Sequence, residues 1–204
     1  MEERTGDKLI EWLYGVLARP VDTLNEIARE KPVGLAFLVY LVVAILVMAA
    51  NIFGGEGLAP LEELMFEIGI AIPLSVIMVG GLLFALVSIF VIAGFLHLLA
   101  RLFGGKGGYW NFFSAYAFAD FPMIITVPFT LIAVFAGVIG SILDGVITFG
   151  ASIWTIVLQV IALRESYGLS TWASIGAYVI QLIIIIVIPL AIAIAFVAVL
   201  FLGI

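Results

Sequence analysis

Residues 29–52, REKPVGLAFLVYLVVAILVMAANI, decide the fold class of this chain. Three charged residues and Pro32 precede an uncharged apolar run of about 20 positions, the length that an α-helix needs to cross the hydrocarbon core of a bilayer. Pro32 suits the first turn of such a helix, because the backbone N–H there has no helical partner. The stretch therefore predicts a membrane-spanning helix whose charged start lies at a membrane surface.

The same pattern of long apolar runs recurs along the rest of the chain. Hydrophobic residues make up 65% of the 204 positions and charged residues 11%, which excludes an ordinary soluble domain. The runs are continuous rather than alternating, which excludes an outer-membrane barrel. We therefore predict an all-α, polytopic transmembrane bundle over residues 33–204, preceded by a cytoplasmic arm, residues 1–32. Its five expected spans cover residues 33–52, 68–100, 112–139, 146–163 and 172–202.

All eight Lys and Arg residues fall on one side of these five spans. Cationic side chains near span ends are retained in the cytoplasm, so the pattern predicts a cytoplasmic N-terminus and an extracytoplasmic C-terminus. We expect a multi-pass protein of the cell (plasma) membrane. The net charge of −6 argues against nucleic acid as a partner. The cationic residues are Arg4, Lys8, Arg19, Arg29, Lys31, Arg101, Lys106 and Arg164.

The N-terminal arm contains a short amphipathic segment, residues 7–18, DKLIEWLYGVLA. It is too short to span a bilayer, so we expect an interfacial helix with Trp12 at headgroup depth. A second short helix is expected over residues 21–30, after Pro20. Two interpretations of the arm remain open: a helix packed on the protein's own cytoplasmic face, or a curvature-sensing or partner-docking helix.

Loops between the expected spans carry interface signals. Trp110 and Trp172 stand at the cytoplasmic starts of two spans, as an aromatic belt predicts, and Arg101, Lys106 and Arg164 could meet lipid headgroups there. The run GGKGG, residues 104–108, lacks the Ser/Thr that ends a phosphate-binding loop, so we interpret it as a flexible turn. Residues 53–67 predict a short amphipathic helix on the outer surface, with Glu56, Glu62, Glu63 and Glu67 exposed.

Four strongly polar side chains stand inside the expected spans: His97, Asp120, Gln159 and Gln181. Polar groups cannot face lipid without cost, so we expect them to converge on one pocket that opens toward the cytoplasm. Asp120 precedes Pro122, which removes a helical partner from the carbonyl of Phe118. Two interpretations remain open for Asp120: a structural group that locks helix contacts, or a site that handles a proton or cation.

Catalytic motifs are missing from the sequence. It contains no His-Glu-x-x-His, no Gly-x-Ser-x-Gly and no second intramembrane aspartate able to form a pair with Asp120. One histidine and no cysteine cannot supply the ligands of a structural zinc site. We therefore predict a protein that is not an enzyme and binds no metal or cofactor.

Five further elements of the sequence are the Pro-initiated helix of residues 20–27, the turn of residues 102–109, the Tyr116-Ala…Pro122 element, Trp154, and the juncture of residues 162–173. Together they resemble the Ypt-interacting protein (Yip) family of five-span membrane proteins. The resemblance implies membrane traffic and Rab-type GTPases as the eukaryotic context. Because only a short arm precedes the first span, we expect a prokaryotic member without GTPase binding.

Two function hypotheses follow from these observations. The first is a membrane-organising or interaction scaffold, whose partners are the lipid bilayer, other membrane proteins or its own copies. The second is a small ion, proton or solute carrier or channel that uses Asp120, supported by His97, Gln159 and Gln181.

Overall fold

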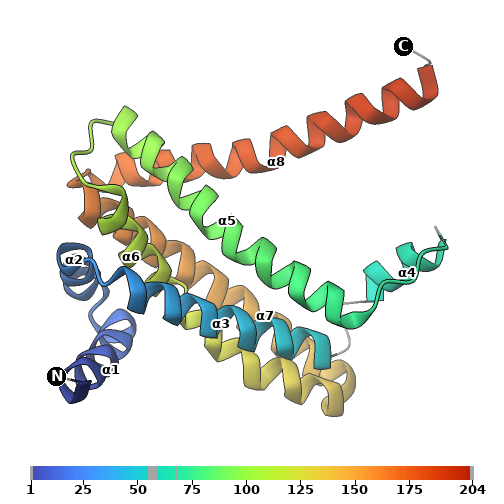
Figure 1. Cartoon of the computed structure of the whole chain (residues 1–204), viewed down its shortest axis with the longest axis horizontal. Coiled ribbons are helices and arrows are strands. Elements are labelled where there is room, and N and C mark those ends of the chain that lie inside the picture. The colour runs from blue at the N-terminus through green and yellow to red at the C-terminus, as the bar shows by residue number, and fades with distance from the viewer. Residues whose placement is uncertain (1, 55–58, 68, 203–204) are drawn as a thin grey trace.

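The computed structural model describes residues 2–54, 59–67 and 69–202, and every regular element in those ranges is helical. The predicted all-α class is therefore confirmed over the described ranges. The elements, which Figure 1 shows in chain order from blue to red, are α1 (Glu2–Ala18), α2 (Pro20–Glu30), α3 (Val33–Phe53), α4 (Ala59–Glu67), α5 (Leu74–Leu102), α6 (Tyr109–Ala119), the 3-10 helix η1 (Phe121–Ile125), α7 (Thr126–Tyr167) and α8 (Thr171–Leu202).

Four stretches of the described chain are long and apolar enough to cross a membrane, where the sequence predicted five. They are Val33–Phe53, Leu74–Leu102, Tyr109–Tyr167 and Thr171–Phe196. The expected third and fourth spans both fall within Tyr109–Tyr167, which contains α6, η1 and α7. The expected second span begins later than predicted, because α5 starts at Leu74, directly after its N-cap residue Pro73.

The backbone of α7 leaves the helical conformation at Gly137, where φ is 57° and ψ is −142°. The sequence placed this boundary between residues 139 and 146. Figure 1 shows the chain turning back here, so that α7 has two legs that run alongside each other, residues 126–136 and 138–167. The hydroxyl of Thr130 on the first leg donates to Asp144 Oδ1 on the second at 2.8 Å, which ties the legs together.

The most completely buried element is α6, in which every residue from Phe112 to Ala119 is buried. It packs against α2, α3, α5 and α7. Its sequence, FFSAYAFA over residues 112–119, alternates large aromatic with small side chains. The small residues let neighbouring helices approach closely, and the aromatic rings fill the remaining space. The core of the molecule therefore surrounds α6.

The N-terminal helices fold back on this core at one end of the molecule (Figure 1). Trp12, expected at headgroup depth, is only 3% exposed, and its ring meets Phe118 edge-on at 5.8 Å between centroids. Its Nε1 donates to Glu26 Oε1 of α2 at 3.1 Å. Because α1 and α2 pack on α6, Trp12 has a protein environment, and its position at headgroup depth stays a prediction.

The segment between α3 and α5 contains the helix α4, as the pattern of residues 53–67 indicated, although Glu56 lies outside the described residues. The helices α5 and α8 pack together at one end and diverge toward the other (Figure 1). Large apolar side chains on both helices are exposed where they diverge, among them Phe84 and Ile186. Such surfaces suit a hydrocarbon environment.

Candidate functional site

Asp120 stands at the change from α6 to η1. Pro122 lies in the first turn of the 3-10 helix, so the expected break at this proline is confirmed. The carbonyl of Phe118, expected to be free, accepts the backbone N–H of Asp120 itself. The tighter turn after Ala119 thus satisfies the carbonyl that the proline leaves without its α-helical partner.

A chain of two hydrogen bonds connects Asp120 to α7 and α8. The Tyr178 hydroxyl donates to Gln159 Oε1 at 2.5 Å, and Gln159 Nε2 donates to Asp120 Oδ1 at 2.7 Å. Because the amide oxygen accepts from the tyrosine, the amide nitrogen faces the carboxylate and donates to it. The network therefore links three elements that are remote in sequence, and Gln159 and Tyr178 are both buried.

Asp120 also borders a groove of about 290 Å³ between α3, α5 and η1. All the lining residues except Val43 are half-buried, so the groove opens on the surface of the bundle. The Tyr40 hydroxyl donates to the carbonyl oxygen of Ala85 at 3.1 Å and bridges α3 to α5 beside the groove. We call this the Asp120 groove; it is lined by Tyr40, Val43, Ala44, Val47, Met48, Ala85, Asp120 and Met123.

The other two polar residues predicted for this site make different contacts. His97 Nδ1 shares a hydrogen bond of 2.5 Å with the hydroxyl of Tyr167, and its ring meets Tyr109 edge-on. Gln181 is 2% exposed and lines a separate groove between α5 and α8, and within the described ranges its Oε1 has no hydrogen-bond partner. The structure thus joins Asp120 to Gln159 but gives His97 and Gln181 other surroundings.

The glycine run of residues 104–108 is a packed junction rather than the expected flexible turn. The backbone N–H of Lys106 donates to the carbonyl of Tyr167 at 3.1 Å. A Cβ built at Gly107 would collide with the carbonyl of Ser166, and one at Gly105 would meet the side chain of Tyr167. Two of the family-like segments, residues 102–109 and 162–173, therefore pack on each other directly.

A polar groove of about 360 Å³ lies on the outer face of α2. Asn25 Nδ2 donates to Glu165 Oε2 at 2.7 Å, and Asn111 Nδ2 donates to the carbonyl of Ala28 at 2.8 Å. The sequence reading missed Asn25, Asn111 and Glu165. The sequence offered one weak signal, the placement of Asn25 and Asn111 next to apolar or aromatic residues. We call this surface the α2 groove; it is lined by Val21, Asp22, Asn25, Glu26, Arg29 and Glu165.

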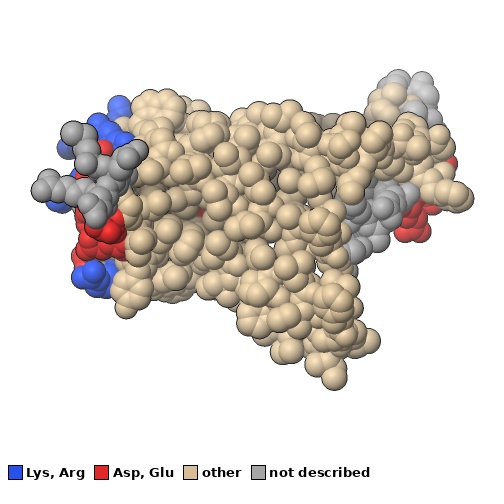
Figure 2. All heavy atoms as spheres, turned by 60° about the horizontal axis from the view of Figure 1, so that its bottom comes forward, with Lys and Arg blue, Asp and Glu red and all other residues tan. Residues whose placement is uncertain are grey.

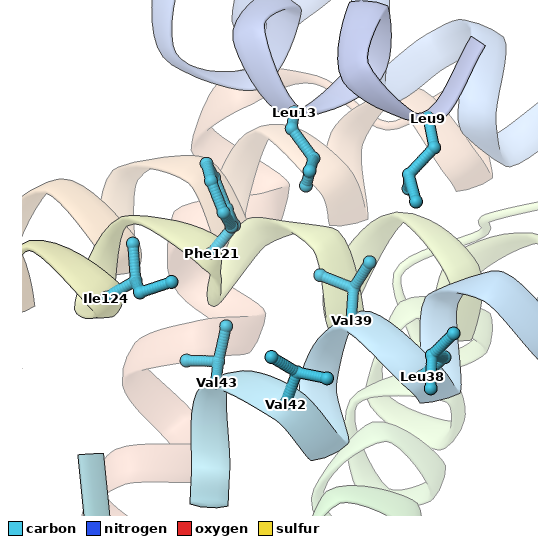
Figure 3. A pocket seen from close by; sticks show the side chains of 8 residues that line it. All are labelled: Leu9, Leu13, Leu38, Val39, Val42, Val43, Phe121 and Ile124. Carbon is cyan, nitrogen blue, oxygen red and sulfur yellow. The ribbon is translucent and has the colours of Figure 1, made fainter. Parts of the chain in front are cut away.

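An apolar groove of about 230 Å³ separates α1 from α3. Figure 3 shows Leu9 and Leu13 of α1 on one side, and Val39 and Val42 of α3 on the other. The predicted apolar side of α1 therefore faces the membrane-spanning part of the protein, and Leu9 and Leu13 pack against the core.

The remaining residues selected from the sequence divide into buried and exposed groups. Tyr116 and Pro122 are buried, and the Tyr116 ring contacts Phe112 at 5.2 Å between centroids. Arg164 pairs with the neighbouring Glu165. Groups of three or more potential metal ligands are absent from the described part of the chain. The exposed residues are Arg101, Lys106, Trp110, Trp154 and Trp172.

Comparison with known families supports the resemblance noted in the sequence. A family profile described as the Yip1 domain matches residues 14–203, which include α2 through α8 and part of α1. No curated protein and no solved structure matches the chain. Because the match extends over nearly all of the helices described above, the chain belongs to the Yip family of membrane proteins.

Proposed function

We propose that this Yip family protein is a non-enzymatic scaffold that organises membrane proteins, with the α2 groove as its docking surface. The observation that carries the proposal is the contrast between the two faces of α2. Leu24 and Ile27 are 0% exposed on one face, whereas Asp22, Glu26 and Arg29 are exposed on the other. One face therefore fixes the helix to the core, and the other remains available to a partner.

The docking surface is held in place before any partner binds. Asn111 ties the backbone of Ala28 to α6, and Asn25 ties α2 to Glu165 near the end of α7. A pre-organised surface binds with a smaller loss of conformational entropy. Because Asp22, Glu26 and Arg29 carry both signs of charge, the surface can select partners by electrostatic complementarity. Membrane-protein partners or further copies of this chain fit these properties.

We further propose five membrane crossings, with the N-terminus in the cytoplasm and the C-terminus outside the plasma membrane of a prokaryotic cell. The reversal at Gly137 supports this number, because it divides Tyr109–Tyr167 into two antiparallel parts. The distribution of charge supports the orientation. On the face that Figure 2 shows, Lys and Arg gather at one end together with acidic side chains, whereas the coloured side chains at the opposite end are all acidic.

Photo-crosslinking in cells tests the scaffold proposal. A benzoyl-phenylalanine in place of Asp22 should give a discrete adduct, and Arg29→Glu should reduce its yield several-fold. The matched control places the crosslinker at Glu11, which is exposed on α1 outside the α2 groove. An adduct at position 22 that Arg29→Glu leaves unchanged, or an equal adduct at position 11, would contradict the proposal.

The second candidate function, a small carrier or channel, is favoured by one observation: the Asp120 carboxylate borders an open groove. Proteoliposomes containing the purified chain test it through proton and monovalent-cation flux. A carrier predicts a flux that Asp120→Asn abolishes and Asp144→Asn preserves. A scaffold predicts that the wild-type protein adds no flux to that of empty liposomes.

A further inference from the structure

We propose that the Asp120 groove binds a lipophilic amine, with the ammonium group against the Asp120 carboxylate and the hydrocarbon chain along α3. This site goes beyond the scaffold function, since it lies on a different part of the molecule from the α2 groove. It requires binding only, and it does not depend on transport.

The first argument is that the Asp120 carboxylate lacks a positive partner. Its Oδ1 accepts from Gln159, whereas Oδ2 makes no hydrogen bond with any described residue. The ion pairs of the described chain involve only the cations of Lys8 and Arg164, and neither pairs with Asp120. Carboxylates within membrane-spanning segments are normally paired. A bound cation would supply the missing charge at Oδ2.

The second argument is that the site suits an ammonium group better than a metal ion. Hard metal ions need about six or more oxygen ligands. Here the side chains that line the groove supply only the Asp120 carboxylate and the Tyr40 hydroxyl as oxygen ligands, and that hydroxyl donates to the carbonyl of Ala85. An organic ammonium needs fewer acceptors, and it gains from a neighbouring aromatic ring such as that of Tyr40. One carboxylate and one tyrosine are sufficient for it.

The third argument concerns the rest of the ligand. Beyond Tyr40 and Asp120, the lining consists of aliphatic side chains and two methionines, Met48 and Met123. Methionine side chains adapt their shape to a flexible hydrocarbon chain. The groove lies between α3 and α5, and exposed apolar side chains such as Leu83 and Phe84 stand on α5 next to the lining residue Ala85. A ligand chain that leaves the groove there would remain in the hydrocarbon part of the bilayer, so the ligand enters from the membrane.

Binding of dodecylamine to the full chain in nanodiscs of zwitterionic lipid tests the proposal. At neutral pH, radiolabelled dodecylamine should bind saturably, above the background of empty nanodiscs. Asp120→Asn should weaken binding at least about tenfold, because it removes a charge-assisted hydrogen bond. Asp144→Asn should leave binding unchanged, since Asp144 lies outside the groove and accepts from Thr130. Dodecanol, which has the same chain without the charge, should not compete.

A second pair of variants keeps the test decisive if Asp120→Asn fails to fold. Ala44→Phe fills the groove without changing the carboxylate, and it should abolish binding. Its control, Ile45→Phe, alters the adjacent residue, which is 40% exposed and outside the lining, and it should bind as the wild type does. The proposal is overturned by non-saturable binding, by equal competition from dodecanol, or by equal binding to folded Asp120→Asn or Ala44→Phe. The crosslinking result at position 22 is independent of all these outcomes.

Discussion

Position 107 has no room for a side chain larger than that of glycine, because the carbonyl of Ser166 occupies the space in which a Cβ would stand. The contact is between backbone atoms, so it cannot be relieved by a side-chain rotation. The neighbouring Lys106 bonds through its backbone N–H to Tyr167, whose hydroxyl in turn bonds to His97. The absence of a side chain at Gly107, together with that at Gly105, thus allows the segment between α5 and α6 to meet the end of α7.

Gly107→Ala should lower the free energy of unfolding by about 1–3 kcal/mol, because the added methyl group overpacks a contact between backbones. Thermal unfolding in detergent measures this as a lower Tm. Gly34→Ala is the matched control, because a Cβ there meets nothing within 4 Å, and we expect it to be neutral or slightly stabilising. Equal Tm values for the two variants would mean that the junction is loose.

At the scale of elements, α7 is divided by one glycine whose conformation other residues rarely adopt. The φ of 57° and ψ of −142° at Gly137 lie outside the regions open to L-residues, although a Cβ there would meet open space. The cost of a substitution at Gly137 would therefore come from backbone strain alone. This separates Gly137 from Gly107, where the cost comes from packing.

Gly137→Ala should destabilise the protein by about 1–3 kcal/mol through backbone strain. Gly150→Ala, on the second leg of α7 and also in open space, should be neutral or stabilising, because alanine favours a helix over glycine. Unfolding by a graded detergent series compares the two variants. Equal stability of Gly137→Ala and Gly150→Ala would contradict the conclusion that the backbone conformation at position 137 requires glycine.

The contact between α1 and α2 includes an ion pair of Lys8 with Glu30, and the Lys8 ammonium lies 5.1 Å from the ring centroid of Trp12. The hydrogen bond with Glu30 raises the pKa of Lys8 above its ordinary value. Because the folded pKa is raised, this stabilisation is fully present below the unfolded pKa, about 10.4, and is lost as the pH rises through the higher folded value.

We therefore expect the stabilisation that the Lys8–Glu30 pair gives to the contact of α1 with α2 to be constant from about pH 6 to 9 and to weaken only above about pH 10.5. A variant that retains Trp12 as its only tryptophan reports this change through its fluorescence emission. Lys8→Met should remove the alkaline transition, whereas Lys106→Met should preserve it. A transition near neutral pH in the parent variant would contradict this interpretation.

At the scale of the whole molecule, the charged side chains gather at the two ends on the face that Figure 2 shows, and few are visible between them. A bilayer would surround this middle part, because the spanning stretches there are apolar and a hydrocarbon core offers no partner to exposed charges. The number of crossings then determines on which side each connecting segment lies. The connection from α7 to α8 distinguishes five crossings from four.

Single cysteines report these sides without background, because the chain contains no cysteine. In the five-crossing arrangement, a membrane-impermeant maleimide should label Asp22→Cys and Ser170→Cys only in inverted vesicles. It should label Glu63→Cys only in intact cells. If Tyr109–Tyr167 crossed once, Ser170→Cys would instead be labelled from outside. Comparison of labelling in cells and in inverted vesicles therefore measures the topology directly.

Much of the helical framework could be predicted from the sequence. The apolar run after Pro32 became α3, with the helix beginning at Val33, and Pro122 interrupted the helix after Ala119 as expected. The two segments packed together at the glycine junction, residues 102–109 and 162–173, were among those that suggested the family. Helix formation, proline breaks and membrane character depend on local composition along the chain, so they can be predicted from the sequence alone.

The tertiary structure decided which residues surround each side chain, and this could not be predicted from the sequence. Trp12 is buried because α6 lies against it, Asp120 is held by Gln159 from α7, and Gly107 is fixed by the carbonyl of Ser166. Each of these environments is created by residues about 40 to 110 positions away in the chain. The physical reason is that packing and hydrogen-bond partners depend on how remote helices meet, whereas hydrophobicity belongs to each residue alone.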